Sequence, residues 1–305
     1  MFHAGYFGLA KESEFGRAVA PTAFLPLRSD VHQETAATRA VAPWGSTLGE
    51  PRPFAFQGGA QAEVEAQPDA FGHLLTAVLG APQTIPFNGV FRHVWEYRGG
   101  RPTYTVEVGA DTLALRASGA QALSLAFGVA AGARLQAQVA FVTRQIAPVA
   151  LGTATYVAEE APLWSTATVQ VSGTADTALS SFAMNVFAPG RAIGGWSSAG
   201  RFAAAAPGGM SVAQLAFVAE GVSSAWIGRF RDQQELSTTI TLTGRLVGTT
   251  SYQVIIECPR FRVSGMNVPV ANRNLPRMNV QGVPFGSTAA GRGVKITIVN
   301  STMGY

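Results

Sequence analysis

Alternation of apolar and polar residues is the dominant pattern in this chain, and it predicts a mainly β protein. Between residues 54 and 67, apolar side chains occupy one set of alternate positions, and glutamine and glutamate occupy most of the other. A period of two places these sets on opposite faces of a strand, one packed and one in water. In residues 236–247, leucine, isoleucine and one threonine likewise oppose serine, threonine and Arg245.

Two short segments change to helical spacing, each directly after an alternating strand. In residues 68–80 the apolar positions fall three and four apart, with Pro68 at the start, Asp69 in the first turn and Gly80 at the end. Residues 221–232 hold the same place after the strand at 210–220. The pattern therefore predicts one short helix packed on each of two sheets.

The order of elements repeats, although the two halves share little sequence identity. A chain of 305 residues can bury two separate cores. We expect two tandem β-sandwich or barrel modules, each with a short flanking α-helix. The division is an N-terminal arm at 1–23, a first module at 24–147, a linker at 148–162 and a second module at 163–305.

Several connections follow from turn residues. Arg98-Gly99-Gly100-Arg101 predicts a hairpin turn between strands at 90–97 and 103–108, and residues 189–209 predict a loop rich in glycine, alanine and serine. The arm shows neither strand nor helix periodicity, yet it contains four aromatic residues. Because aromatic side chains seldom remain in water, we expect the arm to dock on something, and it is long enough to reach a neighbouring subunit.

Composition adds an expectation of self-association. Hydrophobic residues make up 47% of the chain and charged residues 13%, below the roughly 25% charge usual for globular domains. Large neutral surfaces are often buried against other chains. The formal charge is +4 and comes almost entirely from arginine, since Lys11 and Lys295 are the only lysines. Arginine suits interface ion pairs and phosphate contacts, although a GC-rich genome would also favour it.

The chain offers little for catalysis. Its four histidines lack zinc spacing, its single cysteine, Cys258, leaves no intramolecular disulfide, and it has no phosphate-binding loop or GxSxG elbow. Glu63 and Glu65 share a strand face and could act as paired carboxylates, but a solvated sheet face explains them better. We expect no catalytic residue, no metal and no cofactor. Neither a signal peptide nor a membrane-spanning apolar run is evident.

Residues 8–25 read GLAKESEFGRAVAPTAFL. This segment resembles the opening of the major tail tube proteins of long-tailed bacteriophages, which commonly begin with a similar Lys-Glu-Ser, Gly-x-Ala and Ala-Pro-Thr run. The strand-to-helix segment that ends in Leu75–Gly80, and Cys258-Pro259-Arg260 after an apolar strand, are similar to that family too. The resemblance touches both halves of the chain.

The resemblance implies a structural virion protein, assembled in the host cytoplasm, whose rings stack into a hollow tube that carries DNA to the host cell. Two modules per chain resemble two fused subunits, so three chains would form a ring with pseudo-sixfold symmetry. The inner strands would close into one multi-chain β-barrel without exposed edges, and rings stacked head to tail would form a filament. The implied partners are further copies, a tape measure protein, tail tip and terminator proteins, and passing double-stranded DNA bound without sequence specificity.

Alternating polar faces indicate which side chains would meet the DNA. The lumen-facing candidates are Gln57, Gln61, Glu63, Glu65, Thr239, Thr241, Thr243 and Arg245. The candidates for contacts between rings or subunits are Phe7, Phe15 and Trp44, although these aromatics could equally cap their own domain. Such tubes are thought to have an acidic lumen, whereas this chain is net basic. Either the arginines lie outside and between rings, or the resemblance misleads on mechanism.

Two other functions fit parts of the pattern. An outer-membrane β-barrel would also alternate, but the expected helices and the absent signal peptide weigh against it. A carbohydrate-binding β-sandwich would use tryptophans as stacking platforms, but Trp44, Trp95, Trp164, Trp196 and Trp226 are scattered along the chain. Scattered tryptophans indicate core or interface positions instead.

Overall fold

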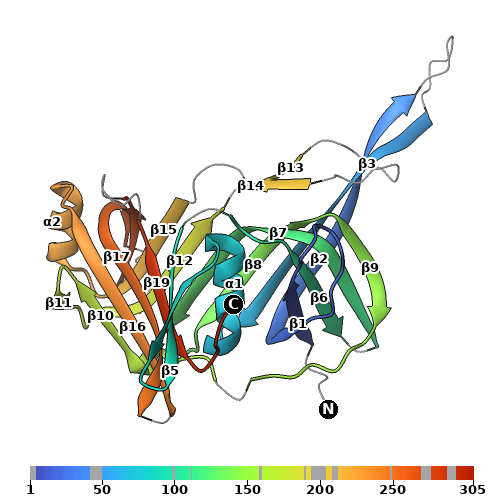
Figure 1. Cartoon of the computed structure of the whole chain (residues 1–305). Helices are drawn as coiled ribbons and strands as arrows, with labels where there is room; N and C mark the ends of the chain where they lie inside the picture. Colours follow the sequence, from blue (N-terminus) through green and yellow to red (C-terminus); the bar gives the residue numbers. More distant parts are fainter. Residues whose placement is uncertain are drawn as a thin grey trace.

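The computed structural model of the chain is mainly β, which confirms the predicted class (Figure 1). The described residues are 5–41, 50–97, 100–110, 112–157, 160–188, 190–193, 204–207, 212–247, 249–268, 276–286 and 293–305. Side chains are described in all of these except 31–41, 50–57, 190–193, 204–207, 212 and 247.

The elements fall into two groups along the chain. The first module contains β1 (Tyr6–Lys11), β2 (Ala23–Val41), β3 (Glu50–Glu65), α1 (Pro68–Leu79), β4 (Gln83–Phe87), β5 (Val90–Glu96), β6 (Tyr104–Ala110), β7 (Leu113–Ala130), β8 (Gln136–Thr143) and β9 (Gln145–Ala150). The second module contains the 3-10 turn Trp164–Thr166, β10 (Ala167–Val171), β11 (Thr174–Ala175), β12 (Leu179–Phe187), β13 (Gly190–Ile193), β14 (Ala204–Pro207), β15 (Val212–Glu220), α2 (Ser224–Arg231), β16 (Leu236–Val247), β17 (Thr250–Asn267), β18 (Arg277–Pro284) and β19 (Lys295–Asn300).

Both helices form where the spacing predicts them. Pro68 lies in the first turn of α1, Asp69 follows, and Gly80 ends the helix with a φ of 91°, which favours glycine. In α2 the Ser223 side chain caps the helix by accepting the backbone N–H of Trp226 at 3.4 Å. α1 buries nearly all of its side chains and α2 buries Trp226, so the strand-to-helix unit predicted from the sequence is present in both modules.

Strand pairing repeats between the modules. Six pairings of the first module have counterparts in the second: β1–β6 matches β10–β16, β2–β3 matches β12–β15, β3–β8 matches β15–β18, β6–β7 matches β16–β17, β7–β8 matches β17–β18, and β7–β9 matches β17–β19. Three β-bulges recur at equivalent places: Leu27/Ser29 with Leu179/Ser181, Tyr104/Val106 with Leu236/Thr238, and Ala122/Ser124 with Val263/Gly265. The repeat is therefore present in hydrogen bonding, down to single bulged residues.

The modules also share one hydrophobic core. Seventeen described strands join into one hydrogen-bonded network, in which β7 of the first module pairs with β12 of the second, and β5 pairs with β19. The buried side chains of both modules form a single cluster. A smaller pair, β13 with β14, lies within the range 189–209 that was predicted to be a loop.

The arm contains a strand that its sequence does not indicate. β1 lies between β2 and β6, and Phe7 is opposite Leu25 on one side and Val108 on the other. Five of its six residues are buried, so the strand has no wet face and no period of two. This part of the arm belongs to the sheet of its own chain.

The predicted hairpin at Arg98–Arg101 is wrong. β5 pairs with β4 and β19, whereas β6 pairs with β1 and β7. The true hairpin joins β4 to β5 through Asn88 and Gly89, which both have positive φ. An Asn-Gly turn is a strong hairpin signal, and it is visible in the sequence.

Candidate functional site

Eight strands form one continuous sheet across both modules, which we name the spanning sheet. Its strand order is β2, β3, β8, β7, β12, β15, β18 and β17. The central contact, β7 with β12, joins the first module to the second. In Figure 1 these strands run from the blue β2 and β3 through the green β7 and β8 to the orange β17.

The two faces of the spanning sheet differ sharply. One face is buried, and it carries Phe127, which contacts Phe71 of α1, and Phe217, which contacts Trp226 of α2. Both helices therefore pack on this face, as does β1, whose Phe7 contacts Phe141 of β8. The opposite face is open to solvent. It includes the exposed apolar side chains of Phe187 and Val283, and most of its larger side chains are polar and partly or fully exposed: Gln61, Glu63, Glu65, Ser124, Gln136, Gln138, Ser181, Asn185, Gln214, Glu220, Asn279 and Gln281.

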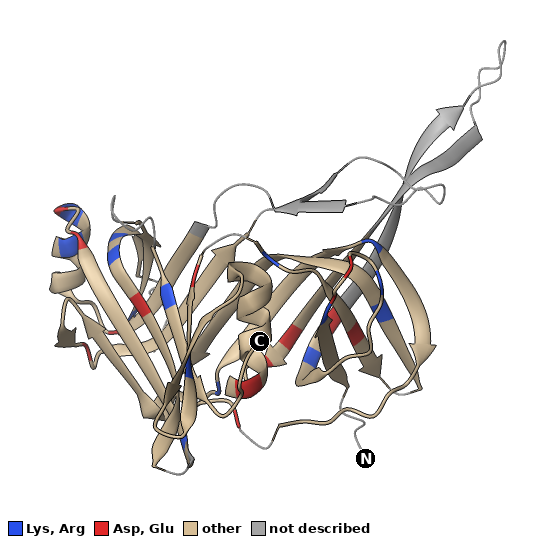
Figure 2. Cartoon of the chain, in the orientation of Figure 1, with Lys and Arg blue, Asp and Glu red and all other residues tan. Residues whose placement is uncertain are grey.

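Charge is sparse and mixed on the open face. Arg28 lies 3.4 Å from Glu63, and Arg277 lies 3.3 Å from Glu220, so carboxylates and guanidinium groups partly neutralise each other. Figure 2 shows the spanning sheet as largely tan. Many of the described arginines lie elsewhere: Arg17, Arg92, Arg101, Arg116, Arg144, Arg229, Arg231, Arg245 and Arg260. The net positive charge of the chain is thus not concentrated on this face.

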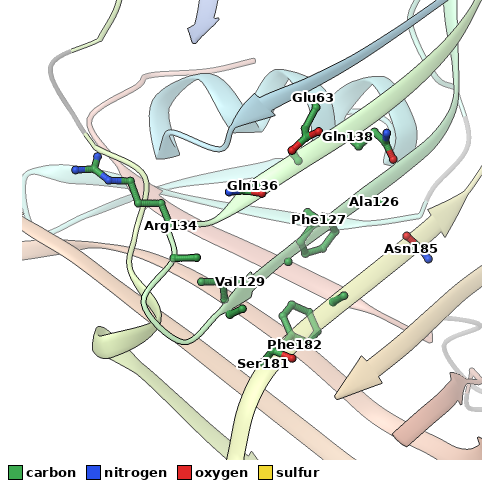
Figure 3. A pocket seen from close by; sticks show the side chains of 15 residues that line it. Glu63, Ala126, Phe127, Val129, Arg134, Gln136, Gln138, Ser181, Phe182 and Asn185 are labelled. Carbon is green, nitrogen blue, oxygen red and sulfur yellow. The ribbon is translucent and has the colours of Figure 1, made fainter. Parts of the chain in front are cut away.

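A hollow of about 490 Å³ lies on the spanning sheet where the modules meet. Gln136 and Gln138 line it from β8, and Ser181 and Asn185 line it from β12 (Figure 3). Glu63 is the one carboxylate among the lining residues. The lining also includes Phe127, Val129, Phe182 and Arg134, so it mixes amides, a hydroxyl, one guanidinium and apolar side chains. A single carboxylate in such a lining offers no pair of groups for acid–base chemistry.

Aromatic side chains link the two helices through the β7–β12 contact. Their ring centroids follow one another at 5.5, 6.1, 6.1 and 6.0 Å through Phe71, Phe127, Phe182, Phe217 and Trp226. These distances lie in the range in which aromatic pairs attract each other. All five rings are buried, so the contact between the modules is built like the interior of one domain.

Two further contacts cross between the modules. The buried guanidinium of Arg101 donates to the carbonyl oxygens of Ala122, in β7, and Ala188, after β12, at 2.8 and 2.7 Å. The β4–β5 hairpin, which we name the clasp, pairs with β19 and places Trp95 opposite Ile296. Together with the β7–β12 contact, these interactions fix the second module on the first.

The last residues of the described chain secure the clasp. The ring of Tyr305 packs against His93 and Trp95 at centroid distances of 4.8 and 5.3 Å, and Asn300 donates to the carbonyl oxygen of Pro68 at 3.0 Å. Burial lowers the pKa of His93, and the neutral ring is held between Thr84 at 2.9 Å and the Asn300 side chain at 3.1 Å. α1, the clasp and β19 are thereby tied at one place.

A buried carboxylate orders the chain after β1. Glu12 is 7% exposed, and it accepts hydrogen bonds from the backbone N–H of Gly16 and Gly119 and from the Thr105 hydroxyl at 2.8–2.9 Å. A buried carboxylate needs such donors. This Glu12 is the glutamate of the Lys-Glu-Ser run quoted above, so that motif has a structural role here.

The structure places the two sets of lumen candidates on different surfaces. Gln61, Glu63 and Glu65 lie on the open face of the spanning sheet. Gln57 belongs to β3, but its side chain is outside the described residues. The second set, Thr239, Thr241, Thr243 and Arg245, lies on β16, which pairs with β10 and with the first half of β17, away from the spanning sheet.

The aromatic contact candidates differ in exposure. Phe7 is 1% exposed and packs in its own core, 6.3 Å from the ring of Phe141. Phe15 is partly exposed, and the guanidinium of Arg144 lies 5.6 Å from its ring. Trp44 lies outside the described residues.

Sequence reasoning missed most of the open face. Gln136, Gln138, Asn185, Gln214 and Gln281 were not singled out, although each follows the same alternation as Gln61. The alternating runs at 134–143 and 179–186 contain that signal. The sequence did not predict that β8 and β12 belong to the same sheet, because the alternation within one strand carries no information about which strands pair.

The described residues show no metal or membrane feature. No group of three or more His, Cys, Asp or Glu side chains in the described ranges could hold a metal ion. No helix within the same ranges is both long and apolar enough to cross a membrane. Cys258 is buried, and burial raises the pKa of its thiol to about 12, so the thiol is unreactive at neutral pH.

Comparison with known families gives the chain its identity. The family model described as phage tail tube protein matches residues 3–285, which include the spanning sheet, both helices and the clasp. A search of curated proteins found no match. A match over this range, together with the β architecture, leads to one conclusion: the chain belongs to the phage tail tube protein family and is a structural component of the virion tail.

Proposed function

We propose that three copies of this chain close into a ring, that the rings stack into the hollow tail tube, and that double-stranded DNA passes through the lumen to the host cell. Assembly takes place in the host cytoplasm. The tape measure, tail tip and terminator proteins are the further partners expected in such a tail. No step of this function requires turnover, and its chemistry lies in shape and surface charge.

One observation supports the proposal above the others: the β7–β12 contact joins the two modules of the chain through paired strand edges. It joins, edge to edge in one sheet, two modules that share six strand pairings and three bulges. Repeating such a contact around an axis closes a sheet into a barrel, which removes exposed strand edges. With two modules in each chain, a pseudo-sixfold ring needs three chains.

The open face of the spanning sheet is the surface that we assign to the lumen. Both helices pack on the opposite face, so they would lie on the outer side of the ring. The inner face then carries Gln61, Glu63 and Glu65 with the amides of β8, β12, β15 and β18. Arg28 and Arg277 also lie on this face, each within 3.4 Å of a carboxylate, so they attract phosphate less than unpaired guanidinium groups would. Neutral amides, carboxylates and paired arginines suit a duplex that must slide, because each arginine–phosphate contact would add salt-dependent binding.

The remaining candidates receive other places in the tube. The threonine row of β16, Thr239 to Thr243, is assigned to the outer layer of the ring. The long β2–β3 hairpin projects from the body of the chain in Figure 1, and residues 42–49, with Trp44, connect its strands. We assign this hairpin and the partly exposed Phe15 to contacts between stacked rings. Phe7 anchors β1 within its own module.

Electron microscopy of the purified protein tests the proposal. We expect hollow tubes whose averaged cross-section shows three chains and six similar modules per ring. A single chain that remains monomeric at every concentration, or tubes with six chains per ring, would contradict it. Phe15→Ala is a useful companion variant, since it should leave the chain folded and shorten the tubes, whereas deletion of residues 1–23 would also remove the buried β1.

A further inference from the structure

The second half of β17 has one unpaired edge among the described strands, whereas the equivalent half of β7 is paired along both edges. In β7, residues Ser124–Ala130 pair with β12 along one edge, and Gln121–Gly128 pair with β8 along the other. In β17, residues Phe261–Asn267 pair with β18 along the equivalent of the second edge. No other described strand pairs with this half of β17 beyond Phe261.

β2 shows the complementary situation. Its counterpart β12 has two neighbours, β15 and β7. β2 pairs with β3 from Leu27 to Val41, and with β1 only from Ala23 to Pro26. From Ser29 onward, β3 is its one partner among the described strands. A strand with one paired edge presents a row of backbone donors and acceptors, which is a template for another strand.

We infer that β17 of one chain pairs antiparallel with β2 of the next chain, in the register that β7 and β12 use within the chain. The occupant of each open edge is thus a second copy of this chain, and the argument for it is continuity with the established β7–β12 contact. This inference rests on the proposed ring and specifies its seam.

The bulges fix the register of the seam. The shared bulges make Ser29 of β2 equivalent to Ser181 of β12, and Gly265 of β17 equivalent to Ser124 of β7. Within the chain, Phe187 is opposite Ser124 and Asn185 is opposite Ala126. Transferring these pairs gives the seam: Thr35 opposite Gly265, Glu34 opposite Met266, Gln33 opposite Asn267 and His32 opposite Val268.

The seam is more polar than the contact that it copies. The positions of Phe182 and Met184 in β12 are held by Asp30 and His32 in β2. A polar edge keeps free chains from sticking to each other through exposed apolar strands. The seam also lacks a second clasp, because α2 ends at Arg231, β16 begins at Leu236, and four residues cannot form a hairpin like β4–β5.

Paired cysteines can test the register. Directly opposite residues of an antiparallel pair lie about 4.5–5.5 Å apart at Cα, within the range that a disulfide spans. The test variant carries Gln33→Cys and Asn267→Cys, and the matched reference carries Asn185→Cys and Ala126→Cys at the equivalent positions inside the chain. An off-register variant carries Gln33→Cys and Met266→Cys, since a shift of one residue places the thiols on opposite faces. The buried Cys258 stays unchanged in all of them.

Mild oxidation of assembled protein followed by a non-reducing gel gives the readout. We expect the test variant to form covalent dimers and trimers with nothing larger, the reference to form only an internal disulfide, and the off-register variant to remain monomeric. Tubes visible by microscopy whose test variant stays monomeric, while the reference oxidises, would overturn the seam and leave the proposed ring intact. A ladder that reaches six chains would support the seam but contradict three chains per ring.

Discussion

Phe182 lies at the centre of the contact between the modules, and its replacement by alanine tests whether they share one core. The side chain is 2% exposed, and its ring contacts Phe127 of the first module and Phe217 of the second, each at 6.1 Å. Truncating a buried phenylalanine costs about 3–5 kcal/mol through lost transfer free energy and the cavity left behind. Because both ring contacts are lost together, we expect about 4 kcal/mol for Phe182→Ala.

Urea unfolding of the unassembled chain, followed by tryptophan fluorescence, measures this loss. With a slope of about 3 kcal/mol per molar urea, 4 kcal/mol would lower the midpoint by about 1.3 M. Ala183→Ser is the control, since Ala183 is the next residue of β12 and faces the opposite, open side. We expect that substitution to change the free energy of unfolding by less than about 0.5 kcal/mol.

The shape of the transition is as informative as its midpoint. One core for both modules predicts a single transition in the wild type and in Phe182→Ala. A loss below about 1 kcal/mol, or a variant in which one module unfolds while the other keeps the wild-type midpoint, would refute the shared core.

Three further predictions use the same unfolding assay. Glu12→Gln should lower stability by about 2–3 kcal/mol, because an amide cannot accept from all three donors and leaves one unpaired; an unchanged midpoint would contradict this. Gly72→Ala should cost about 1–3 kcal/mol, because the added Cβ would collide with the ring of Tyr305, and Tyr305→Ala should relieve that collision in the double variant. Burial lowers the pKa of His73 to about 4, so the unfolded chain, with an ordinary pKa of about 6.5, takes up a proton first as the pH falls. His73 should therefore lower stability by about 1–2 kcal/mol from pH 7 to pH 5, and His73→Gln should reduce the pH dependence to the part that comes from His93, whose pKa burial also lowers.

Alternation and helix signals predict the local structure of this chain well. Residues 68–80 and 221–232 were expected to be helices, and α1 and α2 occupy Pro68–Leu79 and Ser224–Arg231. These segments follow simple rules of spacing and capping. β1 was not predicted because it is buried on both faces, and such a strand lacks the alternation on which the prediction depends.

Bulges explain another limit of prediction from sequence. Pro259 lacks a backbone N–H, yet β17 continues through it from Thr250 to Asn267. The register of β16 on β17 shifts between Cys258 and Phe261, so Pro259 lies in a bulge where no ladder hydrogen bond is required of it. A proline in an alternating run can thus mark a bulge inside a long strand.

The candidate surface was predictable in type but not in extent. The polar face of residues 57–65 was evident from the sequence, and Gln61, Glu63 and Glu65 lie on the open face. The β16 threonines have an equally regular pattern but belong to another surface. Local alternation indicates that a strand has one solvent-exposed face. Only the pairing of strands that are distant in the sequence determines which exposed faces form one surface.

The β7–β12 contact also changes how a tube would grow. When two modules belong to one polypeptide, their meeting is intramolecular, and its probability no longer depends on how dilute the protein is. A closing ring of three such chains would need three partners to find each other instead of six. Three of the six contacts between modules would already exist within the chains before any two chains meet, and dilution would not break them.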